Sequence, residues 1–324
     1  MKNRLIGFDL ARVLAIFYIV GVYHNFGYVG CFHKNHCTLS LVYTTLGVFT
    51  FLSSFLLSSK YTFNGKNETL RFYRKRILRV WPLFVISSLL LFAIHFNPFG
   101  PTIKGIIGLS PFWKPAPKTM WYVAMLLSLY LITPFVRRGR LTAQIMKACF
   151  VLAVVGLIQL VFKSVVNKTF NYYTVYLVGV VLGGNFYQPI LCFLKSKKTL
   201  SLSMIWAVLF VLVYVTKNDW LKSITGVLGI VAMLNVSLLI SEKYSSKQLF
   251  IKVTSVLAYS SFCAYLFHRE VMWLLLHLYR PIEGHFVFLE ILLIGVPLTF
   301  FCAYYIQKIY DGLIAKYNGL LVKE

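Results

Sequence analysis

Residues 7–24 read GFDLARVLAIFYIVGVYH, an apolar stretch with an acid, a guanidinium and an imidazole at Asp9, Arg12 and His24. Ionisable side chains are expensive inside a bilayer, where they mark functional sites by default. The stretch therefore predicts a first membrane helix that carries a polar site.

The composition is that of a chain whose solvent is mostly lipid. Of the 324 residues, 59% are hydrophobic and 13% are charged, and the mean hydropathy is +0.74. These values predict an integral, multi-pass membrane protein. The first apolar segment is too long for the core of a signal peptide and lacks a small-residue cleavage site, so we expect it to be retained.

The formal net charge of +24 does not predict a nucleic-acid partner. The basic residues sit in short links between apolar runs and form no continuous patch. Membrane topology and contact with anionic membrane lipids explain them better.

Taking about 20 apolar residues for one crossing, the sequence predicts an all-α bundle of ten transmembrane helices, at 7–28, 39–58, 80–96, 119–136, 142–162, 171–187, 200–216, 222–241, 252–276 and 286–307. An even number of spans puts both termini on one side. The link 60–79 is rich in Lys and Arg, which places it, and with it both termini, in the cytoplasm. In this topology 22 of the 33 basic residues lie inside, 9 outside and 2 in the membrane. No short-period repeat or soluble domain is visible, so one domain is expected over 1–324.

The outer link 97–118 contains five prolines with two Phe and one Trp between them. This pattern predicts ordered, irregular chain over the outer ends of the helices, with a plain proline-rich spacer as the alternative.

Five short motifs occur in a recognisable order along the chain. They are Phe8-Asp9-Leu10-Ala11-Arg12 leading to His24, Phe51-Leu52-Ser53-Ser54-Phe55-Leu56-Leu57, Phe72-Tyr73-Arg74-Lys75-Arg76-Ile77-Leu78-Arg79-Val80-Trp81-Pro82-Leu83, Met120-Trp121-Tyr122-Val123 and Tyr265-Leu266-Phe267-His268. Together with ten spans, they make the chain resemble the acyltransferase-3 family of integral-membrane O-acyltransferases. The resemblance covers residues 5 to about 310.

The resemblance implies a ten-helix enzyme that takes an acyl group, usually acetyl from cytoplasmic acetyl-CoA, to a hydroxyl of a surface or exported glycan. The expected acceptor is a cell-envelope polysaccharide, its lipid-linked precursor or, less often, a small molecule. The expected location is the bacterial cytoplasmic membrane. No tightly bound cofactor is expected, because acyl-CoA is a co-substrate.

Two departures from the family pattern have structural consequences. The family usually has ten residues between the Arg and the His of the first helix, whereas eleven lie between Arg12 and His24. At about 100° per residue, the extra residue rotates His24 off the family face unless a π-bulge near Gly21 absorbs it; in strict register the position is Tyr23. The family's Ser-Gly-Phe reads Ser53-Ser54-Phe55 here, which predicts a slightly wider helix contact.

The first helix offers the groups that an O-acyl transfer needs. His24 is the natural base, since neutral imidazole is available near pH 7. It lies ~18 Å along the helix from Arg12, which is three residues after Asp9, so these two can pair on one face. The alternative interpretation is a structural Asp9–Arg12 ion pair and an interfacial histidine.

Arg76 and Arg79 are three residues apart and project from one face of a helix that begins in the basic link. Guanidinium groups bind phosphate oxygens bidentately, which suits the phosphates of CoA. The resemblance assigns this Arg-x-x-Arg pattern to the acyl-CoA end of the site. Arg71, Arg74 and Lys75 are expected to contact lipid or set topology, which is also the alternative for the whole group.

Three further positions are candidates for substrate binding. His268 either orients the acceptor or supports the first-helix histidine, or else it marks the interface where its span ends. Trp121 opens the fourth span, where an aromatic-belt residue is the default and sugar stacking the alternative. Ser53 belongs to the set through the second family motif.

The loop from Cys31 to Cys37 contains two Cys and two His. Its spacing is too compact for an ordinary zinc site. The loop is predicted to be extracytoplasmic, where a Cys31–Cys37 disulfide is favoured over free thiols, and both over a metal site.

Two other function classes remain open from the sequence. One is a transporter of a polysaccharide intermediate or small solute, although no repeated halves are visible. The other is a non-catalytic subunit of polysaccharide assembly. Within the acyltransferase reading, no Ser or Cys stands out as a covalent relay, so direct transfer from acyl-CoA is expected.

Overall fold

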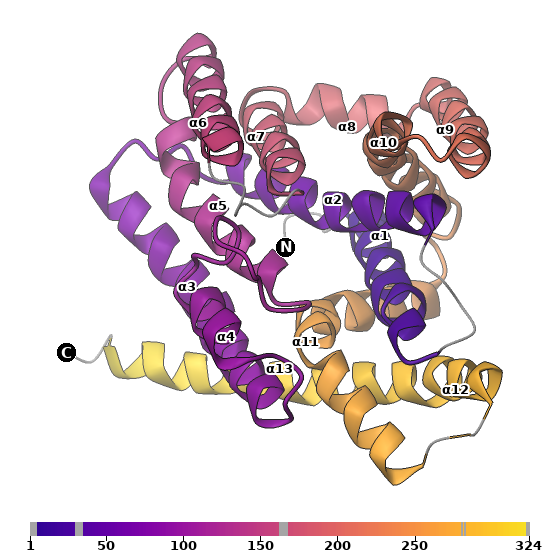
Figure 1. The fold of residues 1–324 in the computed structure, drawn as a ribbon. Coiled ribbons are helices and arrows are strands. Elements are labelled where there is room, and N and C mark those ends of the chain that lie inside the picture. The colour runs from indigo at the N-terminus through magenta and orange to yellow at the C-terminus, as the bar shows by residue number, and fades with distance from the viewer. Residues whose placement is uncertain (1–4, 30–34, 162–167, 280, 282, 322–324) are drawn as a thin grey trace. The chain divides into compact units, whose positions relative to one another are not determined.

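The computed structural model describes residues 5–29, 35–161, 168–279, 281 and 283–321, and every regular element in these ranges is a helix (Figure 1). In chain order the elements are α1 (Ile6–Phe17), the π-helix η1 (Tyr18–Tyr23), the short 3-10 turn η2 (Asn25–Gly27), α2 (His36–Ser58), α3 (Lys66–Ala93), α4 (Phe99–Ile106), α5 (Trp121–Arg137), α6 (Leu141–Val161), α7 (Thr169–Asn185), α8 (Tyr187–Lys195), α9 (Lys197–Thr216), α10 (Asp219–Lys243), α11 (Gln248–Leu278), α12 (Gly284–Glu290), the π-helix η3 (Ile291–Gly295) and α13 (Val296–Leu321).

The all-α membrane bundle predicted from the sequence is confirmed. Within the described ranges, eight helices are long and apolar enough to cross a membrane, and α5 is a shorter apolar helix. α7 and α8 meet the same criterion only as a pair, with a bend of 108° between them, as in a broken span or a re-entrant loop. Each of the ten predicted spans falls on one of these. Many large apolar side chains are exposed, as is expected where lipid is the solvent: Leu160 and Trp220 are each 83% exposed.

The contacts divide the chain into two compact units, residues 1–49 with 192–324 and residues 50–191, and the division falls within α2. In the first unit, α1 packs on α10 and α11, α9 on α10, and α11 on α13. In the second, α7 packs on α5 and α6, and α3 on α4 and α5.

Small residues set the helix contacts of the first unit. A Cβ added at Gly7 of α1 would lie 2.8 Å from the Cα of Leu238 on α10, so the two backbones approach closely. Thr44 of α2 donates a hydrogen bond to the carbonyl oxygen of Gly226 on α10 (3.2 Å). Close packing and interhelical hydrogen bonds of this kind hold membrane helices together, because in lipid there is no hydrophobic driving force for helix association.

Two regions predicted to be links are partly helical. The basic link 60–79 is helical from Lys66 onward, and the 28 residues of α3 span about 42 Å, more than the ~30 Å hydrocarbon core of a bilayer. The outer link 97–118 was predicted to be irregular, but it contains α4. Pro98 caps the N-terminus of α4 and Pro101 lies in its first turn, where a missing N–H costs nothing.

The helix contact at Ser53-Ser54-Phe55 is a close one, because the facing helix α7 presents glycines there. A Cβ at Gly183 of α7 would lie 2.7 Å from the Cα of Phe55 and would also overlap its carbonyl oxygen. A Cβ at Gly179 would overlap the Ser54 hydroxyl. The two glycines, four residues apart on α7, therefore allow α2 and α7 to touch along their backbones.

We expect Gly183→Ala to lower the thermal stability of the protein, since the new methyl group must push against backbone atoms. Overpacking of this kind costs about 1–3 kcal/mol. Gly156→Ala on α6 is the matched control, because its methyl group would meet only Phe170 at 3.5 Å and Ala is the better helix former. Thermal unfolding of both purified variants in detergent checks this; equal melting temperatures would contradict the close α2–α7 contact.

Two arginines at the C-terminal end of α5 bind backbone carbonyl groups of other segments. Arg137, at the end of α5, donates to the carbonyl oxygen of Ser58 (Nε, 3.2 Å) and to that of Gly184 (Nη2, 2.9 Å). Arg138 donates from Nε to the carbonyl oxygen of Phe63 (2.8 Å). These charged donors satisfy carbonyls that a helix end or a turn leaves without a partner.

Candidate active site

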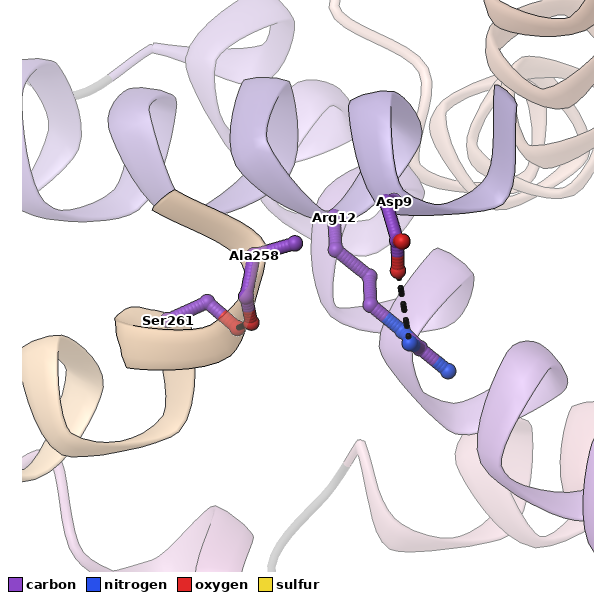
Figure 2. Close-up of polar contacts among 4 residues, drawn as sticks. All are labelled: Asp9, Arg12, Ala258 and Ser261. Carbon is purple, nitrogen blue, oxygen red and sulfur yellow. Dashed lines mark hydrogen bonds and ion pairs between the residues drawn. The ribbon is translucent and has the colours of Figure 1, made fainter. Parts of the chain in front are cut away.

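Asp9 and Arg12 pair on one face of α1, as the spacing predicts. Arg12 Nη1 lies 3.3 Å from Asp9 Oδ1, and the Asp9 residue is 4% exposed. Figure 2 shows the guanidinium of Arg12 below the carboxylate, with Ala258 and Ser261 of α11 alongside. The hydroxyl of Ser261 is turned back to the carbonyl oxygen of Ala258 (2.8 Å).

The eleven residues between Arg12 and His24 include a π-helix. The segment Tyr18–Tyr23 contains Gly21, and the N–H of His24 donates to the carbonyl oxygen of Ile19, five residues earlier, at 2.9 Å. A π-helical turn holds one residue more than an α-helical turn, so the extra residue is absorbed before His24. Of the two outcomes that the spacing allowed, the chain adopts the π-bulge.

Neighbouring groups accommodate the π-helix. The side chain of Asn25 is fully buried, and its Nδ2 donates to the carbonyl oxygens of Gly21 (3.4 Å) and of Phe288 on α12 (3.2 Å). Gly21 faces α13, where an added Cβ would lie 3.1 Å from Val296 Cγ2. The widened turn is thereby anchored to the last membrane segment, which contains a second π-helix, η3, in contact with η1.

His24 meets His268, which comes from the C-terminal half of α11. Nδ1 of His24 lies 2.7 Å from Nε2 of His268, and the two ring planes are inclined by only 6°. The Nδ1 of His268 lies 2.7 Å from the carbonyl oxygen of Tyr265. His268 is fully buried, whereas His24 is half-buried. Two candidates that are 244 positions apart are thus joined by a hydrogen bond, and of the alternatives for His268 the contact to the first-helix histidine is the one present.

Arg269, the next residue on α11, binds the backbone at His24. Its Nη1 donates to the carbonyl oxygen of His24 (3.3 Å), and its guanidinium lies over the ring of Tyr28 (5.2 Å to the ring centroid). The residue is 8% exposed. This buried cation fixes the position at which η1 ends and therefore where the imidazole of His24 stands.

The second unit contains the other four candidates. Arg76 is half-buried and Arg79 exposed on α3, and the Nε of Arg76 is buried with no hydrogen-bond partner among the described residues. Trp121 packs against the rings of Tyr122 and Tyr172, so it is part of an aromatic cluster. The Ser53 side chain is half-buried on α2.

A family model described as an acyltransferase domain, acyltransferase 3, matches residues 5–308. The chain belongs to the acyltransferase-3 family. The match covers both compact units, and with the candidate spans it identifies the protein as an integral, multi-pass membrane acyltransferase. No curated protein and no solved structure gives a significant match.

The interior of this acyltransferase also holds paired hydroxyl groups that the sequence analysis missed. In the second unit, Tyr176 pairs with Thr133 (2.6 Å) and Tyr122 with Thr50 (2.9 Å). A buried hydroxyl needs a partner. Thr133 donates in turn to the carbonyl oxygen of Leu129 (2.9 Å). Tyr176 lies about one helical turn after both Tyr172 and Tyr173, and this spacing was a signal for such a polar interior.

The predicted Cys31–Cys37 disulfide falls on Cys31, which lies outside the described residues. The Sγ of Cys37 lies 3.6 Å from the carbonyl oxygen of Phe210 on α9.

Proposed function

We propose that this membrane acyltransferase transfers an acetyl group from acetyl-CoA to a hydroxyl of a cell-envelope or exported polysaccharide, or of its lipid-linked precursor, in the bacterial cytoplasmic membrane. The observation that carries the proposal is the His24–His268 hydrogen bond of 2.7 Å at the end of a polar first helix. It is the arrangement of an imidazole held in place as a general base.

The reaction needs one proton transfer and one exchange of bonds. His24 takes the proton of the acceptor hydroxyl as its oxygen attacks the thioester carbonyl carbon. The new C–O bond forms, the C–S bond breaks, and His24 returns the proton to the departing thiolate of CoA. Arg12, held by Asp9 at 3.3 Å, lies ~18 Å along the axis from His24, so its fixed positive charge suits holding the anionic acyl donor at the other end of the first segment.

Arg76 and Arg79 are assigned to the phosphates of acetyl-CoA. The buried Nε of Arg76 has a hydrogen-bonding position to offer, and charged hydrogen bonds to phosphate contribute about 1.5–3 kcal/mol each. Ser53 and Trp121 are assigned to the substrate-binding surface on the strength of the family motifs. Transfer is direct, so rapid-quench labelling with radioactive acetyl-CoA is expected to show no acyl-protein intermediate.

The test is mass spectrometry of envelope glycans from cells with and without the gene, followed by transfer from radiolabelled acetyl-CoA with the purified protein. We expect a mass increment of one acetyl group that requires the gene.

We expect Arg76→Ala to raise the KM for acetyl-CoA about tenfold, since a factor of ten corresponds to about 1.4 kcal/mol. Arg74→Ala on the same helix is the matched control and should leave this KM unchanged.

Two results would reject the proposal. One is a set of glycans identical with and without the gene. The other is solute counterflow in proteoliposomes that needs no CoA thioester, which would indicate a transporter.

A further inference from the structure

The hydrogen bonds of His268 determine which of its nitrogens carries a proton. A backbone carbonyl oxygen only accepts hydrogen bonds, and that of Tyr265 lies 2.7 Å from His268 Nδ1. The N–H of His268 is therefore on Nδ1.

His268 is neutral in this position for two structural reasons. Its side chain is fully buried, and the next residue is the buried guanidinium of Arg269, so a second positive charge would be both desolvated and repelled. A neutral imidazole has a single N–H, which leaves a lone pair on Nε2 of His268.

Only one donor–acceptor direction is then possible for the hydrogen bond between the two rings. The nitrogens are 2.7 Å apart, at the short end of the roughly 2.7–3.2 Å range of hydrogen bonds from N–H groups, so the contact between them is a hydrogen bond. Since Nε2 of His268 is the acceptor, Nδ1 of His24 is the donor. The neutral His24 ring consequently has its lone pair on Nε2, the nitrogen that faces away from His268.

We propose that His268 is a positioning residue that fixes His24 in the tautomer whose Nε2 removes the proton from the acceptor hydroxyl. The inference rests on the proposed function, because it assigns the atom that performs the proton transfer proposed above. When Nε2 is protonated, His24 becomes an imidazolium whose Nδ1–H still donates to His268. His268 keeps its own proton throughout, and the proton on Nε2 leaves with the CoA thiol.

Two substitutions separate this role from simple packing. His268→Phe keeps a planar ring but has no acceptor, whereas His268→Gln places an amide oxygen near the former Nε2. We expect His268→Phe to lower kcat by about 10²-fold, the low end for a general base, with the KM for acetyl-CoA within about twofold of wild type. His268→Gln should recover at least about tenfold of that kcat, because its oxygen accepts from His24 Nδ1.

The matched control is His277→Phe. His277 is exposed on the same helix, and its Nδ1 also lies near a backbone carbonyl, that of Trp273 (3.2 Å). We expect wild-type kcat. A wild-type kcat in His268→Phe, or equal losses in the Phe and Gln variants of His268, would overturn the proposal.

The tautomer is also measurable without turnover, by solid-state nitrogen NMR of histidine-labelled wild-type protein in lipid. The expected spectrum shows His24 protonated at Nδ1 and unprotonated at Nε2. The signal is assigned to His24 by its loss in the His24→Gln variant. A His24 protonated at Nε2 would overturn the positioning role even in an active enzyme. An inactive wild type with the expected tautomer would instead reject the proposed function.

Discussion

Replacing His24 by alanine is expected to reduce acetyl transfer by about 10²–10⁴-fold, the usual contribution of a general base. The methyl side chain has no lone pair to take the hydroxyl proton, whereas the binding of acetyl-CoA that we propose for Arg76 and Arg79 is untouched. The KM for acetyl-CoA should therefore stay near the wild-type value while kcat falls. The measurement is transfer of radiolabelled acetyl groups to glycan extracted from cells that lack the gene.

Two control variants belong with His24→Ala. Tyr23→Phe removes only a hydroxyl from the neighbouring position and should keep full activity, as should His277→Ala on α11. If Tyr23→Phe were inactive and His24→Ala active, Tyr23 would be the functional position, as the family's ten-residue spacing after the arginine requires. His24 would then not be the base.

Inserting one alanine between Phe17 and Tyr18 is expected to be as damaging as His24→Ala. The π-helix already absorbs one extra residue, and a second must rotate His24 by about 100° relative to Arg12. Either the hydrogen bond to His268 is then lost, or α1 is displaced from its close contact at Gly7 with α10. Both outcomes disrupt the polar face of the first segment.

Deleting Val22 is the complementary variant and should preserve activity. Removing one residue from a π-bulge returns the segment to an α-helix without moving the flanking residues, so His24 stays beside His268. Acetyl transfer and the amount of protein in the membrane should both be measured. Full activity in the insertion variant, or complete loss in the deletion variant, would contradict the role assigned to the π-helix.

The fold was largely predictable because membrane helices are determined by length and apolarity. Each of the ten apolar runs is a helix, since a backbone in lipid must satisfy its own hydrogen bonds. The link residues were predicted less well. Lys66–Arg79 and Phe99–Ile106 are helical although their composition is that of links, because polarity predicts exposure to water and does not exclude a helix.

The candidate site was predictable only in part. The Asp9–Arg12 pair follows from a spacing of three on one helix. The His24–His268 contact does not follow from any local pattern, because it joins residues from the first and ninth spans and depends on tertiary packing. The fit of α7 against Ser54 and Phe55 was missed for the same reason: Gly179 and Gly183 act on a different helix from the motif that they complete.

The end of α7, beside its corner with α8, is held by the guanidinium of Arg137. A bend of 108° next to Gly183 and Gly184 has the composition of a hinge. Arg137, however, donates to the end of α7 at Gly184 and to the end of α2 at Ser58 through the same planar group. The end of α7 is therefore tied to the end of α2 by charged hydrogen bonds, and a movement of α8 about this corner would leave α7 attached to α2.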